Sequence, residues 1–359
     1  MENLHWPPLP GGRMTADRGT RTALAIIAAI AVVAATWIAA PVFAPVTFAL
    51  FVIAIAWPLQ RRLQSRLPKL VALAIVVLVT VVVFLAFASV IVWGFGRVGR
   101  WVVSDAGRFQ LLYDQMADWL EGHGIAVAGL WADHFNVAWL VRAMQDVIAR
   151  ANTTLTFWLV VLVYVILGLI EVDDAADRVR ALENREAARI LLSGCAEAAA
   201  KFRRYMLVRT AMSALTGALV WVFAALAGLP LAAEWGVIAF ALNYIPFIGP
   251  AIATVFPTLF ALAQFASWEA ALAVFAGLNV IQFVIGSYVE PRVSGTALAV
   301  SPFIVLFAVF LWTFLWGVIG AFIGVPITIA VLTFCAQHPS SRWLADLLGA
   351  RRDKGRSEA

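Results

Sequence analysis

The chain has 359 residues, of which 63% are hydrophobic and only 13% are charged, and its mean hydropathy is +0.91. Soluble globular proteins are about 45–50% apolar and about 25% charged, so this chain has too little polar surface to cover a soluble fold. The composition excludes a soluble enzyme, a disordered regulator and a nucleic-acid-binding domain, although the net charge is +5. It predicts an all-α integral membrane protein, in which each helix of about 20 apolar residues crosses the bilayer.

The N-terminal part predicts a tail and three membrane spans. Residues 1–21 are expected to form a cytoplasmic tail, and residues 22–93 three transmembrane helices, the first two joined as a tight hairpin at Pro41. A secretory signal peptide is the competing interpretation, but the first apolar run is longer than its usual hydrophobic region. Residues 60–69 carry four basic residues and no acidic residue, which places this segment in the cytoplasm by the positive-inside rule.

Residues 94–154 interrupt the apolar pattern with charged residues of both signs. Apolar residues recur among them near helical spacing, which predicts amphipathic helices on the membrane surface or against the bundle. We expect this extramembrane insert on the external side, as a solvated helical segment or alternatively as a gate or lid. Residues 155–170 then predict the fourth transmembrane helix.

A charged segment precedes the remaining spans. Residues 171–204 contain seven acidic and seven basic residues, which predicts one long cytoplasmic helix with opposite charges along its surface. Residues 205–334 predict four more transmembrane helices, interrupted by Pro and Gly in the C-terminal half, at about 205–228, 235–263, 268–288 and 300–334. Residues 335–359 predict a basic cytoplasmic tail, so about eight spans place both termini in the cytoplasm.

The C-terminal half contains few charged residues. Between Thr210 and Ser341 they are Glu234 and Glu269, which we expect in solvated loops, and Glu290 and Arg292. Polar groups inside a span cost free energy unless they face the bundle interior or a water-filled path. Those of the predicted spans are Asn243, Tyr244, Asn279, Gln282 and Ser287. They indicate either hydrogen bonds between helices or a substrate path, with equal weight.

The segment from Asn243 to Pro250 predicts a helix that is broken inside the membrane. Pro246 frees the carbonyl of Leu242, and Gly249 with Pro250 interrupts the helix again. Freed carbonyls at membrane depth are tolerated where they are buried in protein or line a cavity. Because broken helices recur at transport sites near the bilayer midplane, this segment predicts part of a substrate path.

A second interruption runs from Gln282 to residue 295 and contains Glu290-Pro291-Arg292. The acid and the base are expected to pair as a gate, to couple transport to a proton, or simply to cap the span at the interface. Two interrupted helices indicate a transport site more strongly than either does alone. The sequence contains no Walker A loop, no recognisable catalytic motif and no Cys or His pattern for a metal, so we predict neither an enzyme nor a cofactor.

These same segments resemble the autoinducer-2 exporter (AI-2E) family of bacterial membrane proteins. The matching residues of the first segment are Asn243, Ile245, Pro246, Ile248, Gly249 and Pro250. The later matching residues are Gly286, Pro291, Gly295, Ser301, Pro302, Trp316, Gly317, Gly320 and Pro326. One departure is Ser287, which stands where many members carry Asn and which puts a polar contact to the solute in question.

The resemblance implies a multi-pass protein of the bacterial inner membrane that exports a small polar solute without ATP. Autoinducer-2, a furanosyl signal of quorum sensing, is the solute that gives the family its name. The resemblance also implies homo-oligomers, with pentamers among the candidate assemblies. On this basis the substrate path would include the polar residues above with Pro246, Gly249 and Pro250, and Glu290 and Arg292 would serve as the gate or coupling residues.

Two other functions stay open. A sodium or other cation/proton antiporter usually needs a carboxylate deep in the membrane, and no Asp or Glu lies in the middle of a predicted span. A membrane scaffold or sensor without transport would bind partners through the insert at 94–154 or the charged helix at 171–204. In each case the chain contacts the lipid bilayer.

Overall fold

The computed structural model describes residues 18–104, 107, 121–122, 151–294 and 300–349, and within them it consists of helices and short connections, with an isolated bridge between Val300 and Gly349. Among these residues, seven helices are long and apolar enough to cross a membrane, which confirms the all-α membrane class and agrees with the predicted count of about eight. They are α2 (Ala40–Gln64), α3 (Lys69–Ser104), α7 (Ala151–Arg180), α8 (Arg185–Leu226), α10 (Ile248–Phe265), α11 (Trp268–Val284) with its continuation, and α13 (Pro302–Gln337). The predicted N-terminal tail, most of the 94–154 insert and the basic end of the C-terminal tail lie outside the described residues.

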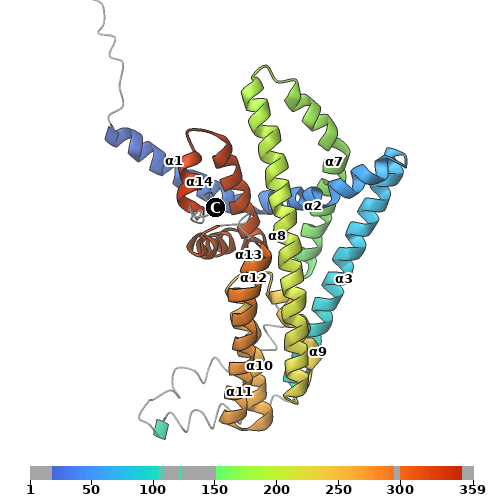
Figure 1. Ribbon diagram of the computed structural model, residues 1–359, viewed down its shortest axis with the longest axis vertical. Coiled ribbons are helices and arrows are strands. Elements are labelled where there is room, and N and C mark those ends of the chain that lie inside the picture. Colours follow the sequence, from blue (N-terminus) through green and yellow to red (C-terminus); the bar gives the residue numbers. More distant parts are fainter. Residues whose placement is uncertain (1–17, 105–106, 108–120, 123–150, 295–299, 350–359) are drawn as a thin grey trace, which may run out of the picture.

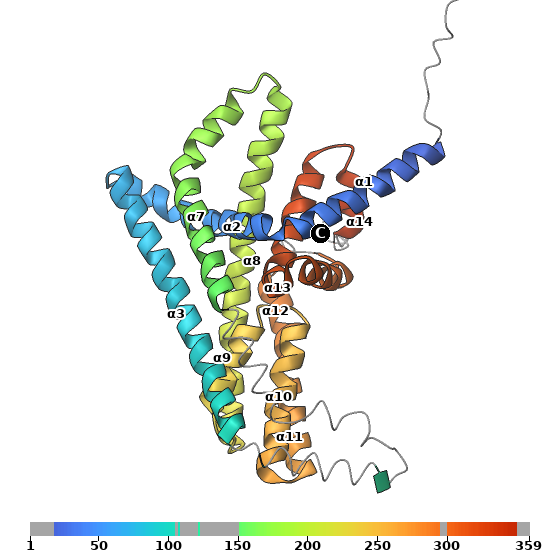
Figure 2. The same cartoon turned by 180° about the vertical axis from the view of Figure 1, so that it is seen from behind.

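Helix α1 (Arg18–Ile38) and α2 follow each other almost end to end (Figures 1 and 2). The predicted hairpin at Pro41 is therefore wrong. The connection is a single residue, Ala39, whose backbone is close to helical (φ −88°, ψ 16°) and whose N–H donates to the carbonyl of Ala35 at 2.9 Å. One residue in this conformation cannot reverse the chain, and Pro41 lies in the first turn of α2, where proline is tolerated.

The predicted charged helix at 171–204 is a helical hairpin in the structure. Helix α7 ends at Arg180 and α8 begins at Arg185, because the side chain of Asn184 accepts a hydrogen bond from the N–H of Ala187 at 3.0 Å and caps α8. From this hairpin α8 continues without interruption into its apolar half. The α7–α8 turn lies at the same end of the molecule as the basic connection between α2 and α3, and the α8–α9 and α10–α11 turns lie at the opposite end (Figures 1 and 2).

Two apolar clusters hold the bundle together. The first joins α2, α3, α7 and α13, and its buried members include Phe48, Val76, Leu169 and Ile323. The second joins α8, α9 (Ala232–Leu242), α10 and α11, and its buried members include Val220, Trp235, Phe260 and Leu278. Large apolar side chains such as Leu70, Leu207 and Val318 remain exposed on the outer faces, where a lipid bilayer would cover them.

The interruptions expected between Asn243 and Pro250 and after Gln282 are present, and α13, the last span, which was expected to be broken or tilted, is broken. The chain leaves helical conformation between α9 and α10, and again inside α13 at Trp316 and Gly317, where Gly317 has φ 63°. A Cβ on Gly320 would lie 1.8 Å from the carbonyl oxygen of Trp312, so the two halves of α13 fold back on each other. The first half, residues 302–315, is roughly 21 Å long and therefore shorter than a hydrocarbon core of about 30 Å.

Glu234, which was expected in a solvated loop, is buried in the first turn of α9. Its Oε1 lies 2.9 Å from Nε of Arg97 on α3, and its side chain is 6% exposed while that of Arg97 is 50% exposed. The expectation is wrong because the start of α9 packs against the end of α3, a contact between segments far apart in the sequence.

Candidate functional site

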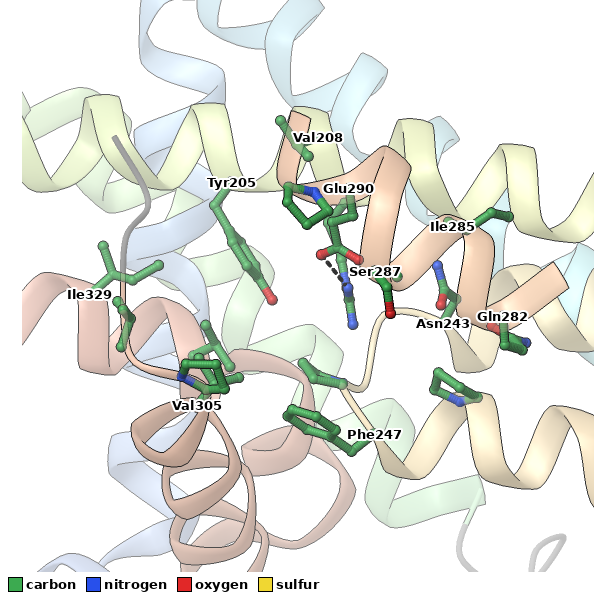
Figure 3. A pocket seen from close by; sticks show the side chains of 18 residues that line it. Tyr205, Val208, Asn243, Phe247, Gln282, Ile285, Ser287, Glu290, Val305 and Ile329 are labelled. Carbon is green, nitrogen blue, oxygen red and sulfur yellow. Dashed lines mark hydrogen bonds and ion pairs between the residues drawn. The ribbon is translucent and has the colours of Figure 1, made fainter. Parts of the chain in front are cut away.

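A cavity of about 540 Å³ lies where the two interrupted helical segments meet α8 and both halves of α13 (Figure 3). Its polar lining consists of Tyr205, Arg209, Asn243, Gln282, Ser287 and Glu290. The remaining lining is apolar, and half of its residues come from α13 and from the turn between α9 and α10. The volume is in the range of sites for small molecules, about 300–1,000 Å³.

The turn between α9 and α10 forms because of its prolines and its glycine. Pro246 cannot donate to the carbonyl of Leu242, which instead accepts the N–H of Ile245 at 2.9 Å. Phe247, which lines the cavity, has φ 63°, a conformation that non-glycine residues rarely adopt. A Cβ on Gly249 would lie 1.9 Å from the carbonyl oxygen of Leu242, so only glycine fits where the chain reverses.

The second interruption is a π-helical segment. Helix α11 continues as a π-helix over Ile285–Val289 and then as the short helix α12 (Glu290–Ser294). Single π-turns inserted in α-helices are frequent at functional sites, because they change the direction of the following side chains. Here the segment places Gly286 and Ser287 at the cavity and Glu290 directly after it.

Glu290 forms an ion pair with Arg209 of α8. Oε1 of Glu290 accepts a hydrogen bond from Nη1 of Arg209 at 2.8 Å, marked by the dashed line in Figure 3. The side chain of Arg209 is 7% exposed and that of Glu290 is 29% exposed. Arg292, the partner considered from the sequence, is exposed on α12 and does not line the cavity.

One turn of α8 holds both interruptions in place. Next to Arg209, the side chain of Thr210 accepts a hydrogen bond from the hydroxyl of Tyr244 at 2.9 Å. Ser213 accepts a weaker one from the side-chain amide of Asn243 at 3.3 Å. This turn of α8 therefore links the α9–α10 turn to the π-helical segment across the cavity wall.

The predicted site residues separate into two groups. Those that line the cavity are Asn243, Pro246, Pro250, Gln282, Ser287 and Glu290. Four others do not line it. Tyr244 stacks on Phe322 with ring centroids 5.2 Å apart, Gly249 is buried under the turn, Asn279 is exposed and donates to the carbonyl of Phe275 at 2.8 Å, and Arg292 is exposed.

Arg209 and Tyr205 are the polar cavity residues that the sequence did not predict. Arg209 lies inside the predicted span at 205–228, and a charged residue inside a span is by itself a signal of a functional site. The signal was hidden because Arg203 and Arg204 lie just before the span, so that Arg209 looks like the end of a basic membrane flank. Within the described ranges, no group of three His, Cys, Asp or Glu side chains is placed to hold a metal ion.

Comparisons with known proteins agree with this architecture. Residues 26–339 match the model of the AI-2E family transporters. The chain is 26% identical over 314 residues to the AI-2 transport protein TqsA of Escherichia coli K12, covering 86% of this chain and 90% of that protein. It is 32% identical over 199 residues to the putative transport protein YhhT of the same organism, covering 55% of this chain and 56% of YhhT. A putative transport protein of Haemophilus influenzae is 23% identical over 93% of this chain and 97% of its own length. The chain belongs to the AI-2E family of membrane transporters.

Proposed function

We propose that this membrane transporter exports a small polar solute through the cavity, by secondary transport without ATP. The observation that carries the proposal is the meeting of two interrupted helical segments at one cavity, whose wall holds an ion pair with a buried arginine. Interrupted helices are a recurring way to build a solute site inside a membrane protein, since their ends offer backbone groups that a continuous helix does not.

The name of one relative supplies the first candidate solute. TqsA is described as an AI-2 transport protein, and its similarity extends over most of this chain. A small polar molecule of this kind would fit a cavity of about 540 Å³ with side-chain amides, hydroxyls and an ion pair in its wall. Autoinducer-2 is therefore the solute to test first.

We further propose that the Arg209–Glu290 pair is the gate. It joins α8 to the segment after the π-helix, so separation of the two side chains would release one wall of the cavity from the other. Leaving the buried charge of Arg209 without a partner is strongly unfavourable, so another group has to pair with Arg209 when Glu290 separates from it.

Cation/proton antiport is the less favoured alternative. Glu290 is the acidic residue that lines the cavity, and Arg209 already neutralises it. A sodium ion at this carboxylate would face the repulsion of a fixed guanidinium at short range. Sodium-driven proton movement in everted vesicles would reverse this ranking.

We propose a location in the bacterial inner membrane with both termini in the cytoplasm. The basic connection between α2 and α3 supports a cytoplasmic position for the end of the molecule that it shares with the charged α7–α8 hairpin. A C-terminal green fluorescent protein fusion should fluoresce in cells, whereas a periplasmic terminus leaves it dark. The homo-oligomer implied by the family, for example a pentamer, is testable from the mass of the purified protein by light scattering.

The transport proposal is tested by metabolite analysis of culture medium from cells with and without the protein. We expect at least one small polar solute, with autoinducer-2 activity measured separately, to accumulate in the medium only when the protein is present. Glu290→Gln should change this accumulation, and Glu269→Gln, at an exposed residue, should not. Identical media in all strains would contradict the proposal.

A further inference from the structure

The cavity contains buried hydrogen-bond donors without partners. In the part of the chain that the structure describes, the Tyr205 hydroxyl, Nε of Arg209 and the side-chain amide nitrogen of Gln282 are buried and make no hydrogen bond, and all three residues line the cavity. Figure 3 shows the hydroxyl end of Tyr205 directed into the space between Glu290 and Val305. Arginine and amide nitrogens can only donate, so what the buried wall lacks is hydrogen-bond acceptors.

Glu290 forms a hydrogen bond with only one of the guanidinium nitrogens of Arg209. A guanidinium matches a carboxylate through two parallel N–H bonds, but here one oxygen of Glu290 contacts Nη1 and Nε is left free. Because Arg209 is almost completely buried, its charge needs a negative partner at every stage of a transport cycle.

Glu290 is the partner that can leave. It is the more exposed of the two side chains, and it begins a short helix that follows the π-helical segment. The other titratable group on the cavity wall is the Tyr205 hydroxyl on α8. Among described residues, α13 contributes only apolar side chains to the wall and the α9–α10 turn contributes Asn243 as its one polar side chain, so no second acid or base competes for Arg209.

We infer that the solute is a small carboxylate, which replaces Glu290 at Arg209 while Glu290 takes up a proton. The inference rests on the proposed export function and names a substrate class other than that of autoinducer-2, which is a furanosyl compound without a carboxylate. With an empty cavity, Arg209 and ionised Glu290 sum to zero charge; with the carboxylate bound and Glu290 protonated, the sum is again zero. Both states avoid an uncompensated buried charge, so one proton accompanies each anion and the cycle moves no net charge.

The inference is tested by binding to the purified full-length protein in dodecyl maltoside, a detergent without phosphate. The probes are lactate and benzoate, each compared with its amide, which has nearly the same size but no charge. We expect at least one acid to bind about tenfold or more tightly than its amide, the difference that a charge-assisted pair supplies. Acid binding should weaken as the pH rises, since one proton accompanies each bound anion.

Variants identify the residues responsible. Arg209→Gln should remove the preference for the acid, and the double variant Arg209→Gln/Glu290→Gln keeps the site neutral in case the single variant does not fold. Glu290→Gln should retain acid binding and lose its pH dependence. Arg292→Gln, an exposed arginine on the same short helix, is the matched control and should leave both properties unchanged.

Equal binding of the acids and their amides would overturn the inference. A preference for the acid that persists in the double variant would overturn it as well. Stabilisation by added phosphatidylglycerol, with no effect of either acid, would assign Arg209 to a lipid headgroup instead. Efflux of a neutral solute with no acid binding overturns this inference and leaves the proposed function, whereas acid binding without any efflux overturns the proposed function.

Discussion

Two ion pairs of similar length lie in different surroundings in this molecule. Arg209 and Glu290 meet at 2.8 Å on the cavity wall, and Arg97 and Glu234 meet at 2.9 Å between α3 and α9. In the first pair the base is the buried partner, and in the second pair the acid is buried while the base is half exposed.

The two pairs have nearly the same length, and their surroundings are what support different roles for them. Arg97 and Glu234 are not among the residues that line the 540 Å³ cavity, and the Arg97 guanidinium lies 5.8 Å from the ring centroid of Trp93. It fastens one helix to another. The Arg209–Glu290 pair faces a cavity, keeps an unused donor and connects two segments that are already interrupted.

The largest effect is expected at the turn between α9 and α10, which lines the cavity that holds the Arg209–Glu290 pair. Gly249→Ala should lower the free energy of unfolding by more than about 3 kcal/mol, because its Cβ would overlap the carbonyl oxygen of Leu242, a backbone atom that cannot move aside. Unfolding in mixed SDS–detergent micelles measures this. Gly286→Ala is the matched control, since a Cβ there meets no atom within 4 Å; a cost comparable to that of Gly249→Ala would show that the close contact is not the cause.

The next effect is an asymmetry within the cavity pair. Glu290→Gln leaves the nearly inaccessible Arg209 unpaired and should cost about 3 kcal/mol, the lower end for breaking a buried pair. Arg209→Gln leaves the more accessible Glu290, which water can reach, and should cost about 2 kcal/mol. Unfolding in the same mixed micelles measures both losses of free energy. Equal losses would mean that the difference in burial between Arg209 and Glu290 does not affect stability.

In the Arg97–Glu234 pair, removal of the base should cost more free energy of unfolding than removal of the acid, the reverse of the cavity pair. Arg97→Gln leaves Glu234 buried without a partner and should cost about 2 kcal/mol, whereas Glu234→Gln leaves a half-exposed arginine and should cost about 1 kcal/mol. Solute efflux by the folded protein should survive both changes. Loss of efflux in either variant at normal expression would mean that the Arg97–Glu234 pair does more than hold α3 against α9.

The smallest effect is expected at a pair without burial. Asp177 and Arg180 form an ion pair near the end of α7, with side chains 71% and 64% exposed. Asp177→Asn should change the free energy of unfolding by less than about 0.5 kcal/mol, since water and salt screen such pairs. A larger loss would indicate that the exposure of an ion pair does not predict its contribution to the stability of this protein.

The sequence predicts the membrane class and the interrupted helices, because apolar run length, proline and glycine act locally. It does not predict which charges meet. Glu290 pairs with Arg209, 81 residues away, rather than with nearby Arg292, and that choice depends on how α8 packs against the π-helical segment. Asn279 is a similar case: α11 is apolar all round, so nothing in its sequence indicates that Asn279 faces outward while Gln282 lines the cavity.

The sequence also did not predict the turn between α7 and α8 or the burial of Glu234. In the hairpin at 171–204, the capping side chain of Asn184 stands at the start of α8 among many residues that favour a continuous helix. Burial of Glu234 depends on the contact of α9 with α3, which no local pattern encodes. Local chemistry thus predicts the breaks at proline and glycine in the C-terminal half, and tertiary packing decides which polar groups these breaks bring together.

The most direct test compares the two pairs as pairs. Each is replaced as a whole, by Arg209→Gln/Glu290→Gln and by Arg97→Gln/Glu234→Gln, so that neither variant keeps an unpaired charge. Release into the medium of the solute that the wild-type protein exports is then measured at matched amounts of folded protein. We predict that the first double variant loses release and the second retains it. Normal release by the first double variant would contradict the assignment of the cavity pair as the gate.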